Sequence, residues 1–260
     1  MRRRASDFLA PAAVVLSLLA LWQLAASWDL LADALNIEPF LVPSPAEIAE
    51  SLWDDRELLL DNAWVTLQEV VLGLALALVI GYALAVALHL SPVLRRALYP
   101  LIVATQTVPV IAIAPILIVW FGFGIGPKLA IIALVCFFPV TVNTLDGLRA
   151  VEPALVRMMR TLDADRGTIL RRVEAPSSLP YFFSGAKIAA AIAVIGAVFG
   201  EWSGANEGLG HLILTSQAQL QTARVFAAVV VLSVIAIALV GLLALAQRRF
   251  AGWSLATDDG

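Results

Sequence analysis

The sequence predicts an all-α membrane protein, a polytopic bundle of six transmembrane helices, on the strength of three observations. Of its 260 residues 61% are hydrophobic and 14% are charged, whereas an ordinary soluble domain is about half apolar and about a quarter charged. The apolar residues form six long runs with almost no charge, and Lys and Arg gather on alternate connections between them. This composition excludes a soluble enzyme and a disordered binding segment, because a soluble domain needs a polar surface to meet water.

Each of the six runs is long enough to form a spanning helix. A helix needs roughly 20 mostly apolar residues to cross a bilayer, because the membrane interior holds no water to bond the backbone. The predicted spans are Phe8–Trp28, Val70–Leu94, Leu98–Phe121, Leu129–Leu145, Ser177–Gly200 and Val225–Gln247. The first is long for the core of a signal peptide and lacks a clear cleavage site, so we interpret it as a retained anchor.

The positions of lysine and arginine predict the orientation. With the N-terminus in the cytoplasm, 13 of the 17 basic residues lie on the cytoplasmic side and three lie outside, while Lys187 falls within a span. Cytoplasmic connections of membrane proteins carry such an excess. We therefore expect a multi-pass membrane protein with both termini in the cytoplasm. The net charge of −3 and the lack of a basic block argue against a nucleic-acid partner.

The predicted external segment 29–61 is acidic, with nine Asp and Glu residues against one arginine. Ser44 is suited to cap a helix, with Pro45 at its first position and Glu47 at its third completing a capping box. We expect a short amphipathic helix at Ala46–Leu60 that lies at the membrane interface and joins the first two spans.

The predicted cytoplasmic loop 147–180 carries six of the arginines. Pro153 is suited to begin a helix there, and Leu155, Met159 and Leu162 form one apolar stripe along it. Asp165 is suited to cap a second short helix, which we expect Pro176 and Pro180 to end. Such a pair of basic amphipathic helices fits either a docking surface for a soluble partner or a loop lying on anionic headgroups.

Polar residues in or beside the spans are candidates for a translocation pathway, because they are costly in lipid and usually face a cavity. The candidates are Gln106, Thr107, Asn143, Glu201 and Trp202. Hydrogen bonding between helices is the alternative interpretation, which we favour for Thr107 and for Thr141. Five glycines are expected to allow close helix packing, namely Gly73, Gly81, Gly185, Gly196 and Gly200.

The sequence offers no catalytic, metal-binding or cofactor-binding site. His89 and His211 lie far apart, and the single cysteine, Cys136, lies in an apolar stretch that predicts a buried thiol. The phosphate-binding pattern Gly-x-x-x-x-Gly-Lys-Ser/Thr is missing, because the stretch 122–128 has the wrong glycine spacing and no following hydroxyl. We therefore expect a chain that is not itself an enzyme.

The loop resembles a cytoplasmic signature of the permeases of ATP-binding-cassette (ABC) importers: Glu-Ala-Ala, three residues, Gly, nine residues, Ile-x-Leu-Pro. Residues 157–159 take the Glu-Ala-Ala place, Asp163 the glycine place and 173–176 the Ile-x-Leu-Pro place, without a gap. Pro176 agrees with that pattern. The departures are Arg157 for the acid, two methionines for the alanines, Asp163 for the glycine and Ala175 for the leucine.

Other stretches resemble the permeases of the sulfonate, taurine and nitrate importer group over nearly the whole chain. They are 42–45 (Val-Pro-Ser-Pro), 107–109 (Thr-Val-Pro), 162–166, 170–173 and 178–189. Within that group, 195–202 (Ile-Gly-Ala-Val-Phe-Gly-Glu-Trp) and 208–210 (Gly-Leu-Gly) are similar to permeases for hydroxymethylpyrimidine-type thiamine precursors.

The resemblance implies a type I ABC importer permease fold, with an anchor and external segment at 1–61, a permease core at 62–249 and a cytoplasmic tail at 250–260. It implies that a coupling helix in the loop contacts a separate ATPase. The implied contact residues are Arg157, Met158, Met159, Asp163, Arg166 and Pro176. The implied partners are two ATP-binding subunits that hold ATP and Mg²⁺, a second copy of this permease, and a periplasmic or lipid-anchored solute-binding protein.

The resemblance implies a hydroxymethylpyrimidine-type thiamine precursor as the substrate. Aliphatic sulfonates, taurine or nitrate remain the alternative for the same machinery. A stand-alone secondary transporter and a membrane-embedded enzyme are the alternative classes, but the sequence shows no convincing inverted repeat and no catalytic constellation within the spans.

Overall fold

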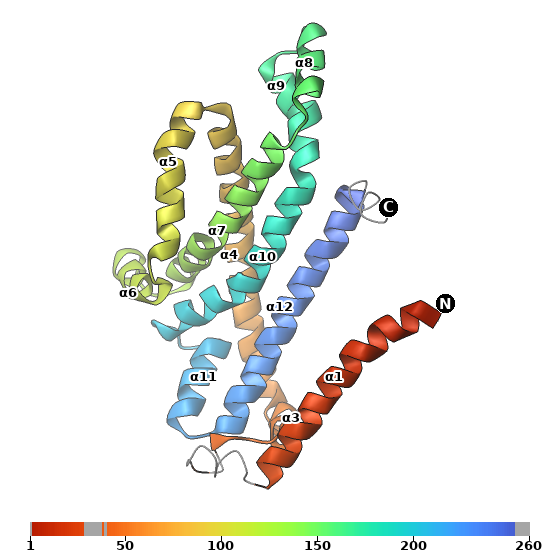
Figure 1. Cartoon of the computed structure of the whole chain (residues 1–260). Coiled ribbons are helices and arrows are strands. Elements are labelled where there is room, and N and C mark those ends of the chain that lie inside the picture. Colours follow the sequence, from red (N-terminus) through yellow and green to blue (C-terminus); the bar gives the residue numbers. More distant parts are fainter. Residues whose placement is uncertain (1, 29–37, 39–40, 253–260) are drawn as a thin grey trace.

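The computed structural model describes residues 2–28, 38 and 41–252, with side chains from residue 13 onward. Most of the predicted tail and most of the segment 29–40 lie outside these residues. Every regular element in the described ranges is a helix, which confirms the predicted all-α class. Figure 1 shows a bundle of long helices with α1 (Arg2–Ser27) standing beside it.

The bundle is built around α7 (Ile125–Arg149), which packs against α4 (Arg56–Leu90) on one side and α10 (Ala175–Trp202) on the other. Glycines allow this close approach. A Cβ added at Gly73 would lie 2.6 Å from Cβ of Ile132, and one at Gly81 would lie 2.8 Å from Cβ of Val140. Gly185, Gly196 and Gly200 of α10 face α7 in the same way. The predicted packing role of all five glycines is confirmed.

Four continuous helices among the described residues are long and apolar enough to cross a membrane. They are α4, α7, the uninterrupted helical stretch Arg166–Trp202 and α12 (Thr222–Phe250). The pair α5 (Pro92–Ala104) and α6 (Val110–Phe121) would be a fifth span, but it is bent by 105°. The apolar part of α1 with described side chains, Ala13–Ser27, is shorter. The predicted count of six spans is therefore not confirmed, and a continuous helix at Leu98–Phe121 is wrong.

The break in this third predicted span follows from Pro109. Proline lacks an N–H and disfavours a helical conformation of the residue before it, and Val108 is extended, with ψ at 123°. A three-residue 3₁₀ turn, η2 (Thr105–Thr107), precedes the break. Thr105 donates its hydroxyl to the carbonyl of Ile102 at 2.7 Å, and Thr107 donates to the carbonyl of Ala104 at 2.8 Å. These side chains satisfy carbonyls where the helix ends.

Further helix boundaries differ from the prediction. The predicted second span reaches Leu94, whereas α4 ends at Leu90 and Ser91 caps α5. The capping box at Ser44 and Glu47 is confirmed, but its helix α3 (Pro45–Asp54) ends six residues before Leu60, because the chain turns at Asp55 into α4. Pro176 and Pro180 do not end a helix. Pro176 lies in the first turn of α10, where a missing N–H costs little, and the helix continues through Pro180. A π turn, η3 (Leu170–Glu174), joins α10 to the short α9 (Arg166–Ile169).

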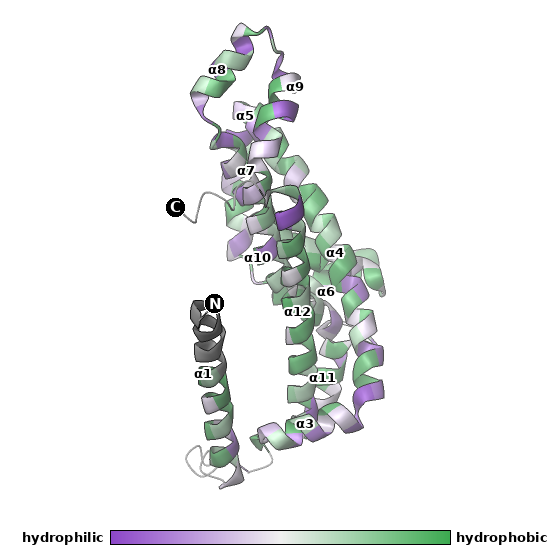
Figure 2. Ribbon diagram, turned by 90° about the vertical axis from the view of Figure 1, so that its right-hand side faces the viewer, coloured by the Kyte–Doolittle hydropathy of each residue, from purple (hydrophilic) through white to green (hydrophobic). Residues whose placement is uncertain are grey.

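The two ends of the bundle differ in charge, and we name them accordingly. The arginine-rich end carries α8 (Pro153–Thr161), α9 and a cavity of 260 Å³ lined by Arg95, Arg96 and Arg149. The acidic end carries α3 and α11 (Leu209–Ala218). Figure 2 shows hydrophilic residues on α8 and α9 and mostly apolar residues along the middle of α12. This segregation agrees with the uneven charge distribution in the sequence.

We predict that Gly81→Ala lowers the free energy of unfolding by about 1–3 kcal/mol, because its methyl group would collide with Val140 in an already packed interface. Unfolding of the detergent-solubilised protein measures this. Gly241→Ala in α12 is the matched control, because an added Cβ there has no heavy atom within 4 Å. The control should be neutral or stabilising by up to about 1 kcal/mol through helix propensity. Equal melting temperatures for the two variants would contradict the packing role.

Candidate functional site

The helix α8 projects from the arginine-rich end and presents most of the predicted coupling residues. It buries none of its residues. Arg157 and Met158 are exposed, Met158 by 51%, and Met159 is half-buried. Figures 1 and 2 show α8 and α9 at the far tip of the molecule. The predicted coupling residues on α8 are therefore free to meet another molecule.

Asp163, which takes the glycine place of the signature, ends α8 in the left-handed conformation that favours glycine. Its φ is 58°. The N–H of Asp163 donates to the carbonyl of Arg160 at 3.1 Å, and the N–H of Ala164 donates to that of Met159 at 3.0 Å. This pair of bonds is a Schellman motif, which needs positive φ, and aspartate is among the residues that tolerate it best after glycine. The substitution of aspartate for glycine thus preserves the turn.

Asp165 caps α9, as predicted. Its carboxylate accepts hydrogen bonds from the backbone N–H groups of Gly167 and Thr168, each at 3.2 Å, and from the Thr168 hydroxyl. The Thr168 hydroxyl and these backbone donors hold the pKa of Asp165 below its usual range. The turn between α8 and α9 therefore has fixed ends on both sides.

An ion cluster at the base of α9, which we name the basal cluster, joins the helix to the bundle and was missed by the sequence analysis. Nη1 of Arg166 lies 2.9 Å from Oε1 of Glu174, and Nε2 of His89 lies 3.0 Å from Oε2 of Glu174. Nη2 of Arg166 lies 2.9 Å from Nε2 of His89. The partners are up to 85 positions apart in sequence, so no local pattern pointed to them. Pro176, the last predicted coupling residue, is half-buried just beyond this cluster.

Three predicted pathway residues, Gln106, Thr107 and Asn143, lie at two separate places in the structure. Gln106 and Thr107 are exposed at the break between α5 and α6. Asn143 is half-buried in α7 and donates to the carbonyl of Pro139 at 2.8 Å. Thr141 also bonds its own helix, through the carbonyl of Phe137 at 2.8 Å, instead of a neighbouring helix. The structure does not gather these residues into one cavity with Glu201.

Glu201, another predicted pathway residue, is 1% exposed and fully engaged by hydrogen bonds. Its Oε1 accepts from the Thr66 hydroxyl of α4 at 2.6 Å, and its Oε2 accepts from the backbone N–H of Gly210 at the start of α11. Trp202 donates its indole N–H to the carbonyl of Gly210 at 3.0 Å. In this structure the two side chains therefore fasten α11 to α4 and α10.

Beside this network lies a buried ion pair that the sequence analysis also missed. Nζ of Lys128 in α7 contacts Oε1 of Glu69 in α4, and the two side chains are 11% and 3% exposed. Glu69 immediately precedes the run that begins at Val70, and a lone acid at that place was the available signal. Lys128 also lines a 710 Å³ cavity with Phe123, Asn206 and Glu207 among its neighbours.

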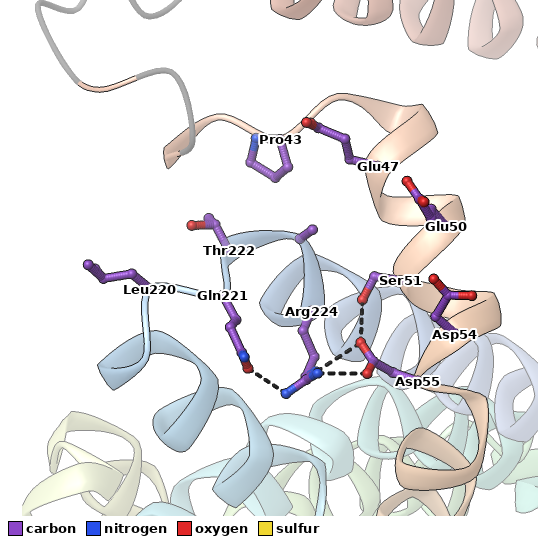
Figure 3. A pocket seen from close by; sticks show the side chains of 11 residues that line it. Pro43, Glu47, Glu50, Ser51, Asp54, Asp55, Leu220, Gln221, Thr222 and Arg224 are labelled. Carbon is purple, nitrogen blue, oxygen red and sulfur yellow. Dashed lines mark hydrogen bonds and ion pairs between the residues drawn. The ribbon is translucent and has the colours of Figure 1, made fainter.

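The acidic end has an open cleft of 510 Å³ between α3 and the turn that joins α11 to α12 (Figure 3). Glu47, Glu50 and Asp54 line it. Arg224 binds Asp55 with two parallel bonds, Nε to Oδ2 at 2.8 Å and Nη2 to Oδ1 at 2.7 Å. The guanidinium of Arg224 holds the pKa of Asp55 below its usual range. This ion pair joins the start of α12 to the turn between α3 and α4, beside the cleft.

No group of three or more His, Cys, Asp and Glu side chains within the described ranges could hold a metal ion. The buried charges instead form pairs and hydrogen-bond networks between helices.

We predict that Lys128→Met lowers the free energy of unfolding by about 3–5 kcal/mol, because it leaves the buried carboxylate of Glu69 without its partner. The double variant Lys128→Met/Glu69→Gln should recover much of that loss, as measured by unfolding in detergent. Lys187→Met is the matched control. Lys187 donates to the neutral side chain of Gln247 at 2.8 Å, so its loss leaves no buried carboxylate without a partner. Equal losses in the single and double variants would contradict the pairing.

Comparison with solved structures supports the fold. The chain is similar to a chain of the MetNI methionine ABC transporter in an inward-facing conformation, with a TM-score of 0.60 and 20% identity over 72% of this chain and 95% of that one. A second match is an amino acid ABC transporter solved with histidines, with a TM-score of 0.61 and 16% identity over 76% of this chain and 97% of that one. The architecture is that of type I ABC importer permeases.

Comparison with curated proteins covers most of the chain. The formylaminopyrimidine transport permease ThiX of Halalkalibacterium halodurans is 39% identical over 236 residues, 90% of this chain and 92% of that protein. The taurine transport permease TauC of Escherichia coli is 31% identical over 248 residues, 92% of this chain and 90% of that protein. The family model of binding-protein-dependent transport system inner membrane components matches residues 77–252. The chain therefore belongs to this family and is a permease subunit of an ABC importer.

Proposed function

We propose that this permease forms the membrane pathway of an importer for a thiamine-precursor pyrimidine, driven by a separate ATPase bound at the arginine-rich end. The single observation that carries the ATPase contact is the projecting α8, which buries no residue and ends in the preserved Schellman turn at Asp163. The ATPase binds and hydrolyses ATP with Mg²⁺, and this chain supplies the membrane pathway.

The contact surface consists of Arg157, Met158, Met159 and Asp163, with Arg166 and Pro176 behind it. Exposed methionines adapt to the wall of a groove, because their side chains are flexible and polarizable. Arg157 stands where the family signature has an acid, so it requires an acidic patch on the ATPase. Two ATPase subunits bind two copies of this permease in this arrangement.

The solute crosses between the two permease copies, on the side where α5 and α6 break. Gln106 and Thr107 are exposed at the break, and Val119 and Trp120 of α6 are 82% and 73% exposed. An exposed polar turn inside a spanning segment is stable where it faces a cavity or another protein surface. Of the other predicted pathway residues, the buried Glu201 supports the route together with Trp202 by fastening α11 to α4 and α10, and Asn143 is half-buried in α7. ATP binding and hydrolysis switch the route between inward-facing and outward-facing states.

The arginine-rich end faces the cytoplasm together with both termini, in accordance with the excess of basic residues there. The acidic end then faces outward in the bacterial inner membrane. A periplasmic or lipid-anchored binding protein delivers the solute to that end, where α3 and the cleft of Figure 3 are exposed.

The substrate is a neutral pyrimidine of the formylaminopyrimidine or hydroxymethylpyrimidine type, as the 39% identity to the ThiX permease suggests. A sulfonate, taurine or nitrate is the alternative solute for the same machinery, and the 31% identity to the taurine permease TauC supports that alternative.

We predict that Arg157→Glu combined with Asp163→Arg abolishes association with the ATPase. The first change reverses the charge of the contact, and the second places a residue that disfavours positive φ in the turn. Co-purification of the tagged ATPase with the permease measures this. Asp163→Gly is the control, because glycine keeps the turn, and it should retain the ATPase. Unchanged co-purification of the double variant would contradict the ATPase contact.

We predict that the reconstituted complex hydrolyses ATP faster when its binding protein is loaded with formylaminopyrimidine or hydroxymethylpyrimidine than when it is loaded with taurine or an aliphatic sulfonate. Rates of phosphate release from proteoliposomes with each solute measure this preference. Stimulation by the sulfonates alone would reverse the substrate assignment while leaving the ATP-driven mechanism in place.

A further inference from the structure

The basal cluster ties three elements together at one point. Its residues come from the C-terminal end of α4 (His89), the start of α9 (Arg166) and η3 (Glu174). The side chains of Glu174 and His89 are 4% and 9% exposed, whereas that of Arg166 is 43% exposed. The cluster is therefore a buried contact between the base of the α8–α9 loop and α4, with one partner reaching toward the surface.

This cluster lies where the loop becomes part of the bundle. Farther out, α8 buries no residue. Closer in, Ile169 is 1% exposed, and Leu170 packs on an apolar cluster that contains Leu88 of α4. A force applied to α8 from outside reaches the spans through two connections, residues 150–152 into α7 and α9 with η3 into α10. The basal cluster is the polar contact that joins the second connection to α4.

The geometry of the cluster gives His89 two alternative partners. Its Nε2 atom lies 3.0 Å from a carboxylate oxygen of Glu174 and 2.9 Å from Nη2 of Arg166. Nε2 can donate only when it carries a hydrogen, and can accept only when it carries a lone pair. It therefore bonds either Glu174 or Arg166 at one time. Two mutually exclusive bonds in one buried cluster are suited to an element that changes position during a transport cycle.

The helix α4 continues from this cluster to the polar network near the acidic end. Thr66 and Glu69 of the same helix bond Glu201 and Lys128 there. The helix is uninterrupted from Arg56 to Leu90. His89 and Thr66 are thus joined by about 35 Å of continuous helix at about 1.5 Å per residue, and a shift at one end is carried to the other.

We propose that His89 and Glu174 are positioning residues that transmit movement of the ATPase-contacting loop to α4, and so couple ATP hydrolysis to the pathway. This inference rests on the proposed function, because it requires an ATPase at α8. It adds that the loop acts on α4 through the basal cluster, which lies outside the proposed ATPase contact except for Arg166. The proposal does not depend on which solute is transported.

The test uses the full complex of permease, ATPase and binding protein in proteoliposomes. His89→Leu removes both alternative bonds, and Glu174→Gln removes the charge while keeping an acceptor for Arg166. We expect both variants to retain bound ATPase and its basal hydrolysis. The amount of solute imported per ATP hydrolysed should fall about tenfold, a typical size for coupling between two sites.

Two further variants separate coupling from folding. His89→Gln offers both an N–H donor and an oxygen acceptor near the same place and should restore most of the import per ATP. Arg171→Gln removes an exposed arginine of η3, for which no ion pair is recorded among the described residues, and should behave as wild type. Thermal unfolding of each variant accompanies the transport assay.

Wild-type import per ATP in both His89→Leu and Glu174→Gln would overturn the proposal. So would a loss that parallels a lower melting temperature or a lost ATPase and that His89→Gln does not restore. Failure of the unmodified permease to bind the ATPase would overturn the proposed function itself. That result comes from the unmodified protein, so the two failures are distinguishable.

Discussion

The absence of water in the membrane interior is the constraint on which the rest of this structure depends. Polar side chains that are buried between the helices, within the spans or at their ends, must likewise bond one another, and each bond then dictates which helices are neighbours. The Thr66 hydroxyl bonds Glu201 at 2.6 Å, and Lys128 pairs with Glu69. These bonds connect α4, α7, α10 and α11 near one end of the bundle. The same residue types that are costly in lipid thus specify the arrangement of the spans.

The helices α4, α7 and α10 form the core of the bundle, and the other elements are attached to it. Glycines of α4 and α10 let both helices pack closely on α7, so these three elements form a rigid core. The broken pair α5 and α6 and the separate α1 lie at its edge. A rigid core with one projecting loop is an arrangement that converts movement of the loop into a shift of whole helices, as an importer driven by a separate ATPase requires.

Sequence patterns predicted the all-α class, the four long spans and the local caps, because each depends on neighbouring residues. The capping box at Ser44 and the helix cap at Asp165 are of this kind. The prediction failed at the break before Pro109, since composition alone does not tell a kinked helix from a helix that ends. It also missed the pair between Glu69 and Lys128, 59 positions apart, because such pairing is decided by the packing of distant helices.

Uptake of radiolabelled solute into proteoliposomes decides whether an ATPase drives transport through this permease. We expect hydroxymethylpyrimidine to accumulate only when the permease, its ATPase and its loaded binding protein are all present with hydrolysable ATP. A non-hydrolysable ATP analogue should stop accumulation. Uptake by the permease alone, driven by an ion gradient and independent of ATP, would show instead that the chain is a secondary transporter.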